Sequence, residues 1–382
     1  MNILLTGIDG YVGWPTALKL SQLHPEARIV GVDNLGRRAW VQECGAVSAV
    51  PVADMDTRLV AAAEHGFGNI SFVPGDLTDR DFVLRLFRMY HFDAVLHLAA
   101  QPSAPYSQID GERANFTQFN NNQMLRNLLW AIKECGLAKT CKVVATTTTG
   151  VYGAPAYPIP EGFVTAEHQG VRDTVLHPGM AGSWYHMSRA FDVCNLWLAN
   201  RQWKTSILDL RTSIVYGLQT AETDLDPRLA TRFDFDFYFG IVLNRFCAMA
   251  LTGYPITIYG RGDQKKPFIP LEDCAESCAR ALDADFAGRF VVYNQTTETV
   301  SIKDMAYGIR DAAEKQGVKV EVTHIENPRV EDEAHKMEMD NQGFLTLLPG
   351  RPHRYEDLID GIIKGLMPLR EVMARYKNRF MN

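Results

Sequence analysis

The chain has 382 residues, of which 46% are hydrophobic and 22% charged, and its net charge is −6. This composition predicts a soluble globular protein of one large or two medium domains. The charge gives no case for binding to nucleic acid or to a membrane surface, and no apolar run reaches the ~18 residues that span a bilayer. Seven scattered cysteines indicate reduced thiols in the cytoplasm, and nothing near Cys274 and Cys278 supports a metal site.

The first thirteen residues predict the start of a dinucleotide-binding βαβ unit. An apolar strand at 2–5 is followed by Gly7, Gly10 and Gly13, and then by a helical pattern of apolar residues. Glycines at this spacing make a tight turn, let the backbone approach a pyrophosphate, and let helix and strand pack closely. The free N–H groups at the start of the helix then bind the phosphates.

Asp33 strengthens this prediction. It ends a second apolar strand at 28–32, twenty residues after the last glycine. A carboxylate there is expected to accept hydrogen bonds from the adenosine ribose, and it would repel a 2′-phosphate. The residues therefore favour NAD, although Arg37 and Arg38 keep NADP open. The alternative role for Asp33 is to cap a helix or turn.

Apolar strands and amphipathic helices alternate along the chain, which predicts a doubly wound parallel sheet, an α/β fold of the Rossmann type. Further strands are expected at 70–73, 94–98, 142–147 and 205–210, and helices at 54–65, 79–90, 112–135 and 183–201. Later helices are expected at 237–251, 271–282, 302–315 and 355–377.

This pattern predicts an NAD-binding domain over 1–216 and a smaller, mostly helical substrate domain over 217–382. One or two segments of the second are expected to return to the first. Residues 153–182 are rich in Pro and Gly. A stretch of that length is uncommon as a structureless connector, so we interpret it as a substrate lid or an ordered loop.

A threonine and a tyrosine suggest the chemistry. Thr148 ends a predicted strand, and Tyr185 opens the next long helix, so both can meet one substrate hydroxyl. Arg189, one turn after the tyrosine, would favour the phenolate, which can take the hydroxyl proton while hydride leaves for a nicotinamide. Thr146, Thr147 and Thr149 compete for the threonine role. The alternatives are a packed tyrosine and an arginine that pairs on its own helix.

These motifs resemble those of the extended short-chain dehydrogenases/reductases, the nucleotide-sugar epimerase and dehydratase family. The resemblance covers nearly the whole chain and includes Gly75-Asp76-Leu77, His97-Leu98-Ala99-Ala100, Asn121, Arg211 to Gly217 and Tyr259 to Asp273. Within the family, six strings are most similar to the sulfoquinovose synthase branch: VDNLGRR, QPSAPYSQID, FTQFNNN, GSWYHMSRAFD, RFDFDFYFGIVLNRFC and NPRVEDEAH.

The resemblance implies an enzyme that uses NAD as a recycled cofactor. The sugar of a nucleotide sugar is oxidised at C4, the C5 proton becomes acidic, water is lost across C5–C6, and the hydride returns. The implied catalytic residues are Tyr185 as base, Thr148, Arg189, and His186 as a proton relay, for which a structural role is the alternative. Two long helices, 112–135 and 183–201, imply a homodimer.

Further site residues follow by position. The implied cofactor-binding residues are Gly7, Asp9, Gly10, Tyr11, Val12, Gly13, Asp33, Asn34, Arg37, Asp76, Leu77, Leu98, Ala99, Ala100, Gln101, Asn121, Tyr185 and Arg189. The implied substrate-binding residues are Ser103, Thr148, Thr149, Asn244, Arg245, Lys266 and Arg329.

The chain departs from the family at several positions. Arg189 replaces the usual lysine, and its planar head cannot reproduce an ammonium bonded to both ribose hydroxyls. Thr149 and Gly150 replace the aspartate–glutamate pair of the 4,6-dehydratases. Pro102 and Lys266-Pro267 stand where the sulfoquinovose synthases carry an arginine and arginine-glycine.

These departures leave the substrate open to another nucleotide sugar or to the sugar of a nucleoside. They also leave two alternative functions. One is simple C4 epimerisation of a nucleotide sugar. The other is a catalytically silent NAD-binding regulator or partner subunit, which the arginine at position 189 suggests.

Overall fold

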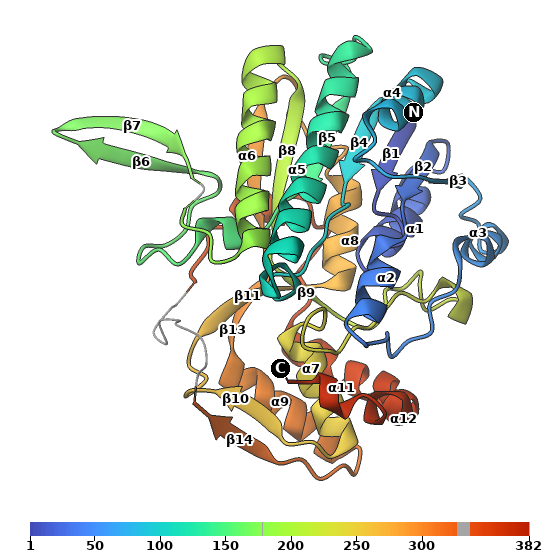
Figure 1. Cartoon of the computed structure of the whole chain (residues 1–382), viewed down its shortest axis with the longest axis vertical. Helices are drawn as coiled ribbons and strands as arrows, with labels where there is room; N and C mark the ends of the chain where they lie inside the picture. The colour runs from blue at the N-terminus through green and yellow to red at the C-terminus, as the bar shows by residue number, and fades with distance from the viewer. Residues whose placement is uncertain (178, 327–336, 382) are drawn as a thin grey trace.

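A seven-stranded parallel sheet forms the centre of the molecule in the computed structural model, which describes residues 1–177, 179–326 and 337–381 (Figure 1). The strand order is β12-β8-β5-β4-β1-β2-β3. The strands are β1 (Asn2–Thr6), β2 (Arg28–Asp33), β3 (Ile70–Pro74), β4 (Ala94–His97), β5 (Lys142–Thr146), β8 (Ser206–Thr212) and β12 (Phe290–Gln295). The order reverses between β1 and β4, and ligands of such sheets bind outside the strand ends at that point. The predicted doubly wound sheet is confirmed.

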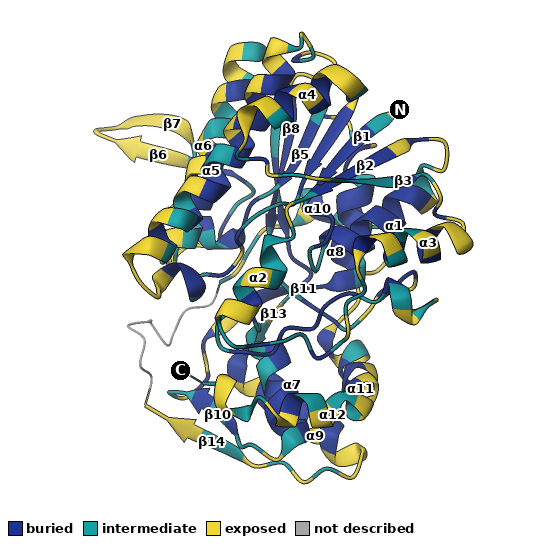
Figure 2. Cartoon of the chain, turned by 45° about the vertical axis from the view of Figure 1, so that its right-hand side comes forward, coloured by how far each residue is buried: buried dark blue, intermediate teal, exposed yellow. Residues whose placement is uncertain are grey.

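Helices cover both faces of this sheet, so its central strands are buried runs of apolar residues (Figure 2). One face packs against α1 (Gly13–Leu23), α3 (Met55–Glu64) and α8 (Leu271–Arg280). The other packs against α4 (Arg80–Tyr90), α5 (Gly111–Glu134) and α6 (Trp184–Trp203). Asp54, Asp79, Asp110 and Ser183 cap four of these helices by accepting backbone N–H groups. Within the described residues no helix has both the length and the hydropathy of a membrane span.

The second half of the chain builds a smaller body below the sheet (Figure 1). Its helices are α7 (Val242–Thr252), α9 (Ile302–Lys315), α11 (Tyr355–Leu366) and α12 (Arg370–Ala374). Its strands form a three-stranded sheet of β13 (Glu298–Ser301), β11 (Lys265–Pro270) and β9 (Ile214–Tyr216), and a pair of β10 (Ile256–Tyr259) and β14 (Val322–Ile325). A separate hydrophobic core joins these elements.

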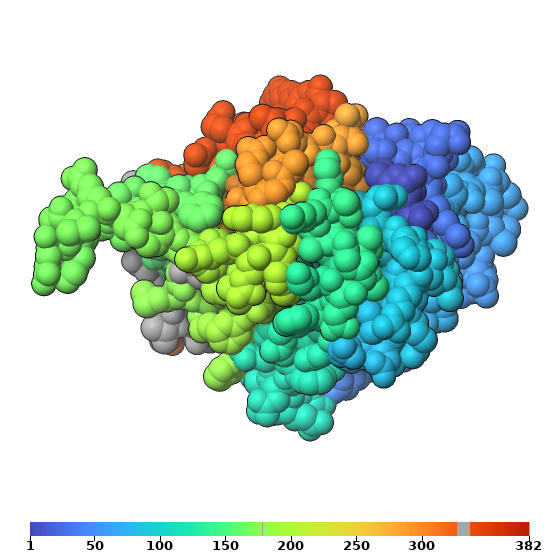
Figure 3. Space-filling view, turned by 90° about the horizontal axis from the view of Figure 1, so that it is seen from above, coloured from blue at the N-terminus to red at the C-terminus, as the bar shows by residue number. Residues whose placement is uncertain are grey.

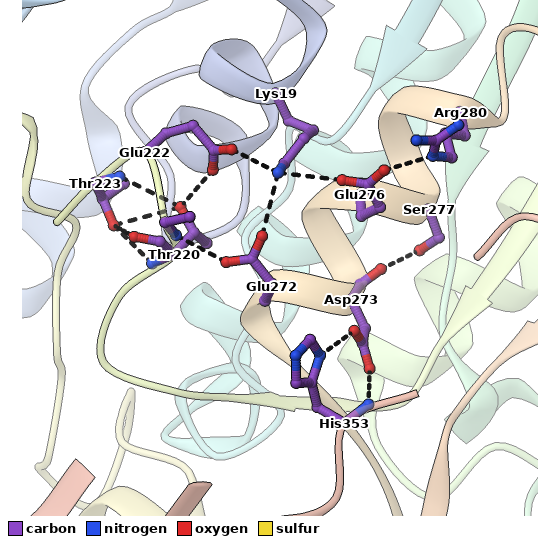
Figure 4. A network of polar contacts seen from close by, with 11 residues as sticks. Lys19, Thr220, Glu222, Thr223, Glu272, Asp273, Glu276, Ser277, Arg280 and His353 are labelled. Carbon is purple, nitrogen blue, oxygen red and sulfur yellow. Dashed lines mark hydrogen bonds and ion pairs between the residues drawn. The ribbon is translucent and has the colours of Figure 1, made fainter. Parts of the chain in front are cut away.

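Two segments of the second half return to the large sheet. β12 pairs in parallel with β8 at its edge, and the short helix α10 (Gln342–Leu345) packs beside β12. α8 packs along α1. Lys19 of α1 lies in a buried cluster with Glu222 (2.5 Å), Glu272 (3.2 Å) and Glu276 (3.1 Å), which fixes α8 against α1 (Figure 4). Burial lowers the pKa of Lys19, but the three carboxylates, Glu222 most of all, together outweigh burial, and the net shift of the pKa is upward.

Some predicted elements differ from the structure. Helix α7 begins at Val242 instead of residue 237, because the Asp236 carboxylate accepts the N–H groups of Tyr238 (2.8 Å) and Phe239 (2.9 Å) and holds them in a turn. The predicted helix at 355–377 is interrupted at Met367–Leu369, around Pro368. Helix α2 (Gly36–Glu43) was not predicted.

The Pro- and Gly-rich stretch at 153–182 contains regular structure. Its middle forms an antiparallel hairpin of β6 (Phe163–His168) and β7 (Val171–Leu176). The hairpin stands away from the body of the molecule (Figure 3). The two ends of the stretch 153–182 line the central cleft, through Gly153, Ala154, Met180 and Gly182.

Candidate active site

A cleft of about 850 Å³ opens where the central strands end, between the sheet and the smaller body. This volume is toward the upper end of the range for small-molecule sites. The sheet side contributes the glycine loop, the residues after β4 and β5, and the first turn of α6. The other side contributes residues 237–249 and strands β10 and β11. The cleft therefore joins the two halves of the chain.

The glycine loop forms a cradle on the sheet side. Gly7 has a φ of +77°, which side-chain-bearing residues rarely adopt, and a Cβ there would collide with the backbone of Ala99. A Cβ on Gly13 would collide with the Gly7 carbonyl oxygen. Tyr11 and Val12 complete this wall of the cleft. The close backbone packing fits the pyrophosphate of NAD at the start of α1.

Asp33 lies at the end of β2 and lines the same cleft. Its carboxylate accepts the N–H groups of Asp9 (3.0 Å) and Leu35 (2.7 Å). Burial raises the pKa of Asp33 to about 6. A carboxylate held in this way at the cleft wall suits the ribose hydroxyls of NAD.

Arg37 and Arg38 are each paired with a carboxylate. Arg37 Nη2 lies 2.7 Å from Asp234 Oδ2. Arg38 donates two hydrogen bonds to the Asp9 carboxylate, at 2.8 and 2.7 Å, and Arg58 reaches the same carboxylate at 3.2 Å. The Asp9 side chain therefore pairs with two arginines and does not line the cleft, although it was predicted to bind the cofactor.

Three more of the predicted cofactor-binding side chains are also held by the protein and are not among the residues that line the cleft. Asp76 accepts from the Thr78 N–H and hydroxyl. Gln101 donates to Thr117, and Asn121 bridges the Gln101 backbone to Ser188 of α6. The structure brings the remaining predicted cofactor residues to the cleft wall: Gly7, Gly10, Tyr11, Val12, Gly13, Asp33, Asn34, Arg37, Leu77, Leu98, Ala99, Ala100, Tyr185 and Arg189.

The threonine after β5 that meets Tyr185 is Thr148, which hydrogen-bonds its side chain. The hydroxyl of Thr147 donates to Asp209 at 2.6 Å instead, and that of Thr146 donates to the His97 carbonyl. Burial raises the pKa of Tyr185, while the charge of Arg189 and the Thr148 hydrogen bond lower it in part, and the net shift is upward. Thr148 and Tyr185 thus form a pair that faces the cleft.

Arg189 is buried beside this pair and is anchored on its own helix. Its Nη1 lies 2.7 Å from the Asp192 carboxylate, and its Nη2 donates to the Thr146 carbonyl. Asn122 of α5 donates to the other Asp192 oxygen at 2.8 Å. Burial raises the pKa of Asp192 to about 6. The arginine still lines the cleft, so its charge acts on Tyr185 from a fixed position.

His186 packs its ring against Gly150. A Cβ on Gly150 would collide with the Cδ2 and Nε2 edge of the ring. Nδ1 of His186 lies 2.9 Å from the hydroxyl of Ser183, which also caps the helix. Burial and then the charge of Lys266 lower the pKa of His186 to about 4, so the imidazole is neutral at physiological pH. The ring therefore occupies the space that a side chain at position 150 would fill.

The predicted substrate-binding residues lie on both sides of the cleft. Ser103 donates to the Tyr238 carbonyl, and Thr149 begins the 3-10 turn Thr149–Tyr152. Asn244 donates to the Asp234 carbonyl at 2.9 Å, and its own oxygen is buried without a partner among the described residues. Arg245 stacks over Phe237, and Lys266 of β11 lines the cleft. Arg329 lies outside the described residues.

Several lining residues were not predicted. They include Trp40, Asn120, Asp234, Phe237, Tyr238, Phe239 and Gln264. Four of them belong to the string RFDFDFYFG, which carries part of the family resemblance but in which no site residue was predicted. The aromatic run lines a cleft because the turn at Asp236 presents it there instead of in a helix.

A parallel sheet with a glycine cradle at its switch point, next to a threonine–tyrosine pair, defines an NAD-dependent enzyme of the short-chain dehydrogenase/reductase class. The chain belongs to the NAD-dependent epimerase/dehydratase family, whose model matches residues 3–294. It is 38% identical to the chloroplastic UDP-sulfoquinovose synthase of Spinacia oleracea, over 95% of this chain and 74% of that protein. It is 36% identical to the UDP-sulfoquinovose synthase of Sulfolobus acidocaldarius, over 99% and 95% of the two chains.

Solved structures support the same fold. The UDP-glucose 4-epimerase of Stenotrophomonas maltophila, solved with NAD and formylated UDP-arabinopyranose, matches with a TM-score of 0.72 at 19% identity over 98% of this chain and 99% of that one. The UDP-glucuronic acid 4-epimerase of Bacillus cereus, solved with UDP-glucuronic acid and NAD, matches with a TM-score of 0.67 at 20% identity over 98% and 100%.

Proposed function

We propose that this enzyme dehydrates the sugar of a nucleotide sugar across C5–C6 through a transient C4 ketone. The observation that carries the proposal is the cluster of Tyr185, Thr148 and His186 in one cleft beside the glycine cradle. The sequence identity of 38% and 36% to two UDP-sulfoquinovose synthases, along nearly the whole chain, supports it. NAD held by the glycine cradle would supply the hydride acceptor for C4 oxidation and the hydride for its reversal.

In this proposal Tyr185 takes the C4 hydroxyl proton and Thr148 orients that hydroxyl. Both side chains line the cleft, and Thr148 lies close enough to Tyr185 to lower the pKa of its phenol, so the two can reach one substrate hydroxyl. Arg189 contributes through its positive charge, which lowers the pKa of the phenol against the effect of burial. Its ion pair with Asp192 keeps that charge in place without a contact to the substrate.

His186 carries the elimination step. As a neutral imidazole it accepts the C5 proton, which the C4 ketone has made acidic, and then donates a proton to the C6 hydroxyl. The C5–H and C6–O bonds break, the C5–C6 double bond forms, and water leaves. Because glycine at position 150 has no side chain, the His186 ring fits against it, and the contact with Ser183 fixes the orientation of the ring.

Residues on both sides of the cleft would bind the substrate. We propose that Asn244, Arg245 and Lys266, with Arg329 by sequence position, bind the nucleotide diphosphate, and that Ser103 and Thr149 contact the sugar. Charge-assisted donors are the groups that a diphosphate requires. Asn244 lines the cleft, and its side-chain oxygen has no partner among the described residues.

The test is a reaction in D₂O with a panel of UDP-, dTDP- and GDP-hexoses and nucleosides, with and without sulfite. One substrate is expected to lose a water by mass spectrometry, and the substrate recovered from the reaction is expected to carry deuterium at C5, because the dehydrated product itself has no hydrogen there. A C4 epimerase would instead change only the C4 configuration and leave C5 unlabelled. Absence of both water loss and C5 exchange across the panel, in protein that binds NAD, would overturn the proposal.

We also propose that the enzyme works in the cytoplasm as a homodimer. All seven cysteines are free thiols, as expected in a reducing compartment. Large apolar side chains are exposed on the neighbouring helices α5 and α6: Phe119, Trp130, Trp184, Phe191 and Leu198. Such a patch indicates a protein–protein contact, which a second copy of the two helices would cover.

A further inference from the structure

Two arginines follow Asp33 in the sequence, where a cation can accommodate the 2′-phosphate of NADP. Arg37 and Arg38 follow Asp33 at the start of α2, and Arg37 lines the cleft beside Asp33. Arginine is the side chain best suited to bind a phosphate through two parallel hydrogen bonds. Their presence in an NAD-dependent enzyme therefore needs a physical explanation.

Each arginine is held by a buried carboxylate from another part of the chain. Asp234 binds Arg37 at 2.7 Å, and its side chain is only 4% exposed. The Arg37 guanidinium also lies 4.3 Å above the ring of Phe239. Asp9 binds Arg38 at 2.7 Å and is only 1% exposed.

Withdrawing Arg37 from Asp234 would disturb more than one contact. Asp234 belongs to the segment whose following residues, Phe237 to Phe239, line the substrate side of the cleft. Asn244 donates to the Asp234 backbone carbonyl. A 2′-phosphate that attracted Arg37 would leave the buried Asp234 carboxylate with Arg232, at 3.5 Å, as its one remaining cation among the described residues, and would loosen that segment.

We propose that Asp234 is a specificity-determining residue for the cofactor, because it engages Arg37, which lines the cleft and would otherwise bind the 2′-phosphate of NADP. NADP is then excluded twice, once by repulsion from Asp33 and once because Arg37 is already paired with Asp234. Removing Asp33 alone does not admit NADP. This inference concerns the cofactor and holds whatever sugar the enzyme uses.

The test compares the affinities of NAD and NADP for the cofactor-free protein by calorimetric titration at one fixed ionic strength. The variants are D33S, D33S/D234N and D33S/D234N/R37M. D33S is expected to keep its preference for NAD. D33S/D234N is expected to bind NADP at least ~10-fold more tightly than D33S, because Arg37 is released. Adding R37M is expected to remove that gain.

Two results would overturn the proposal. One is D33S protein that already binds NADP as tightly as NAD. The other is a folded D33S/D234N protein with no gain in NADP affinity. If D234N disrupts folding, as judged by circular dichroism, D33S/R37M decides the question. Because Arg37 is already paired with Asp234, the R37M change should leave NADP affinity within ~2-fold of that of D33S. A larger decrease in NADP affinity would show that Arg37 binds the 2′-phosphate despite Asp234.

Discussion

At the scale of single residues, Tyr185 is the side chain on which the proposed chemistry depends most. Burial raises the pKa of its phenol, and only the Thr148 hydrogen bond and the charge of Arg189 act in the other direction. Tyr185→Phe removes the proton acceptor and keeps the ring. We expect turnover to fall by ~10²–10⁴-fold, with NAD affinity changed by less than ~3-fold, in steady-state assays and cofactor titration. Undiminished turnover would refute the assigned role.

A substitution at His186 should separate C4 oxidation from the elimination of water. His186→Asn leaves Tyr185 and Thr148 in place but removes the imidazole edge that lies against Gly150. C4 oxidation should continue while elimination stops. We therefore expect absorbance near ~340 nm to accumulate on addition of substrate, with loss of product formation of at least ~10²-fold. A variant that still eliminates water at the wild-type rate would make His186 a structural residue.

Asp33 makes cofactor binding sensitive to pH. Burial raises its pKa to about 6. Ribose hydroxyls donate more strongly to the ionised carboxylate, so protonation competes with NAD binding, and affinity decreases as pH falls through that value. Because protonation of Asp33 and NAD binding are coupled, NAD affinity at one pH unit below this pKa should be at most about 10-fold lower than at neutral pH. Titrations across this range should show it, and Asp33→Asn, which cannot ionise, should give a flat profile.

The glycine cradle, Asp33 and Tyr185 were predictable from sequence because local spacing places them. Thr148 was chosen among four threonines through the family resemblance, because local spacing alone cannot decide between them: Asp209, which engages Thr147, comes from β8 far along the chain. The pairing of Arg189 with Asp192 was foreseen only as an alternative. Its support by Asn122 from another helix has no local signal.

At the scale of elements, most predicted helices and strands of the first half agree with the structure to within two residues. The errors lie where a side chain or a proline overrides helical periodicity, as at Asp236 and Pro368. The hairpin β6–β7 was missed because most of its residues are exposed and show no apolar alternation against a core.

This hairpin contributes little to the core of one chain. Phe163 packs on Phe290 at its base, but the residues from Thr165 to Thr174 are exposed. Replacing 165–174 with a short Gly-Ser turn should therefore shift the melting temperature by less than ~2 °C and leave NAD affinity unchanged, by calorimetry and titration. A larger loss of stability would mean that the hairpin is covered by another chain in solution.

At the scale of the whole molecule, the exposed side chains of α5 and α6 predict association. Trp130 is 51% exposed and Phe191 47% exposed. Changing both to glutamate places charges in the proposed dimer contact without touching a buried residue. Light scattering after size exclusion should change from a dimer to a monomer mass, whereas glutamate at the exposed Val60 of α3 should not change it. A wild-type monomer would contradict the proposal.

The return of β12 and α8 to the large sheet has a consequence for synthesis. During translation, the first five strands of the sheet and β8 emerge well before residues 271–295, which supply α8 against α1 and the edge strand beside β8. Until then, the apolar face of α1 and an unpaired strand edge are open to other chains. A nascent chain stopped near residue 216 is therefore expected to need chaperone protection, although it contains the entire glycine loop.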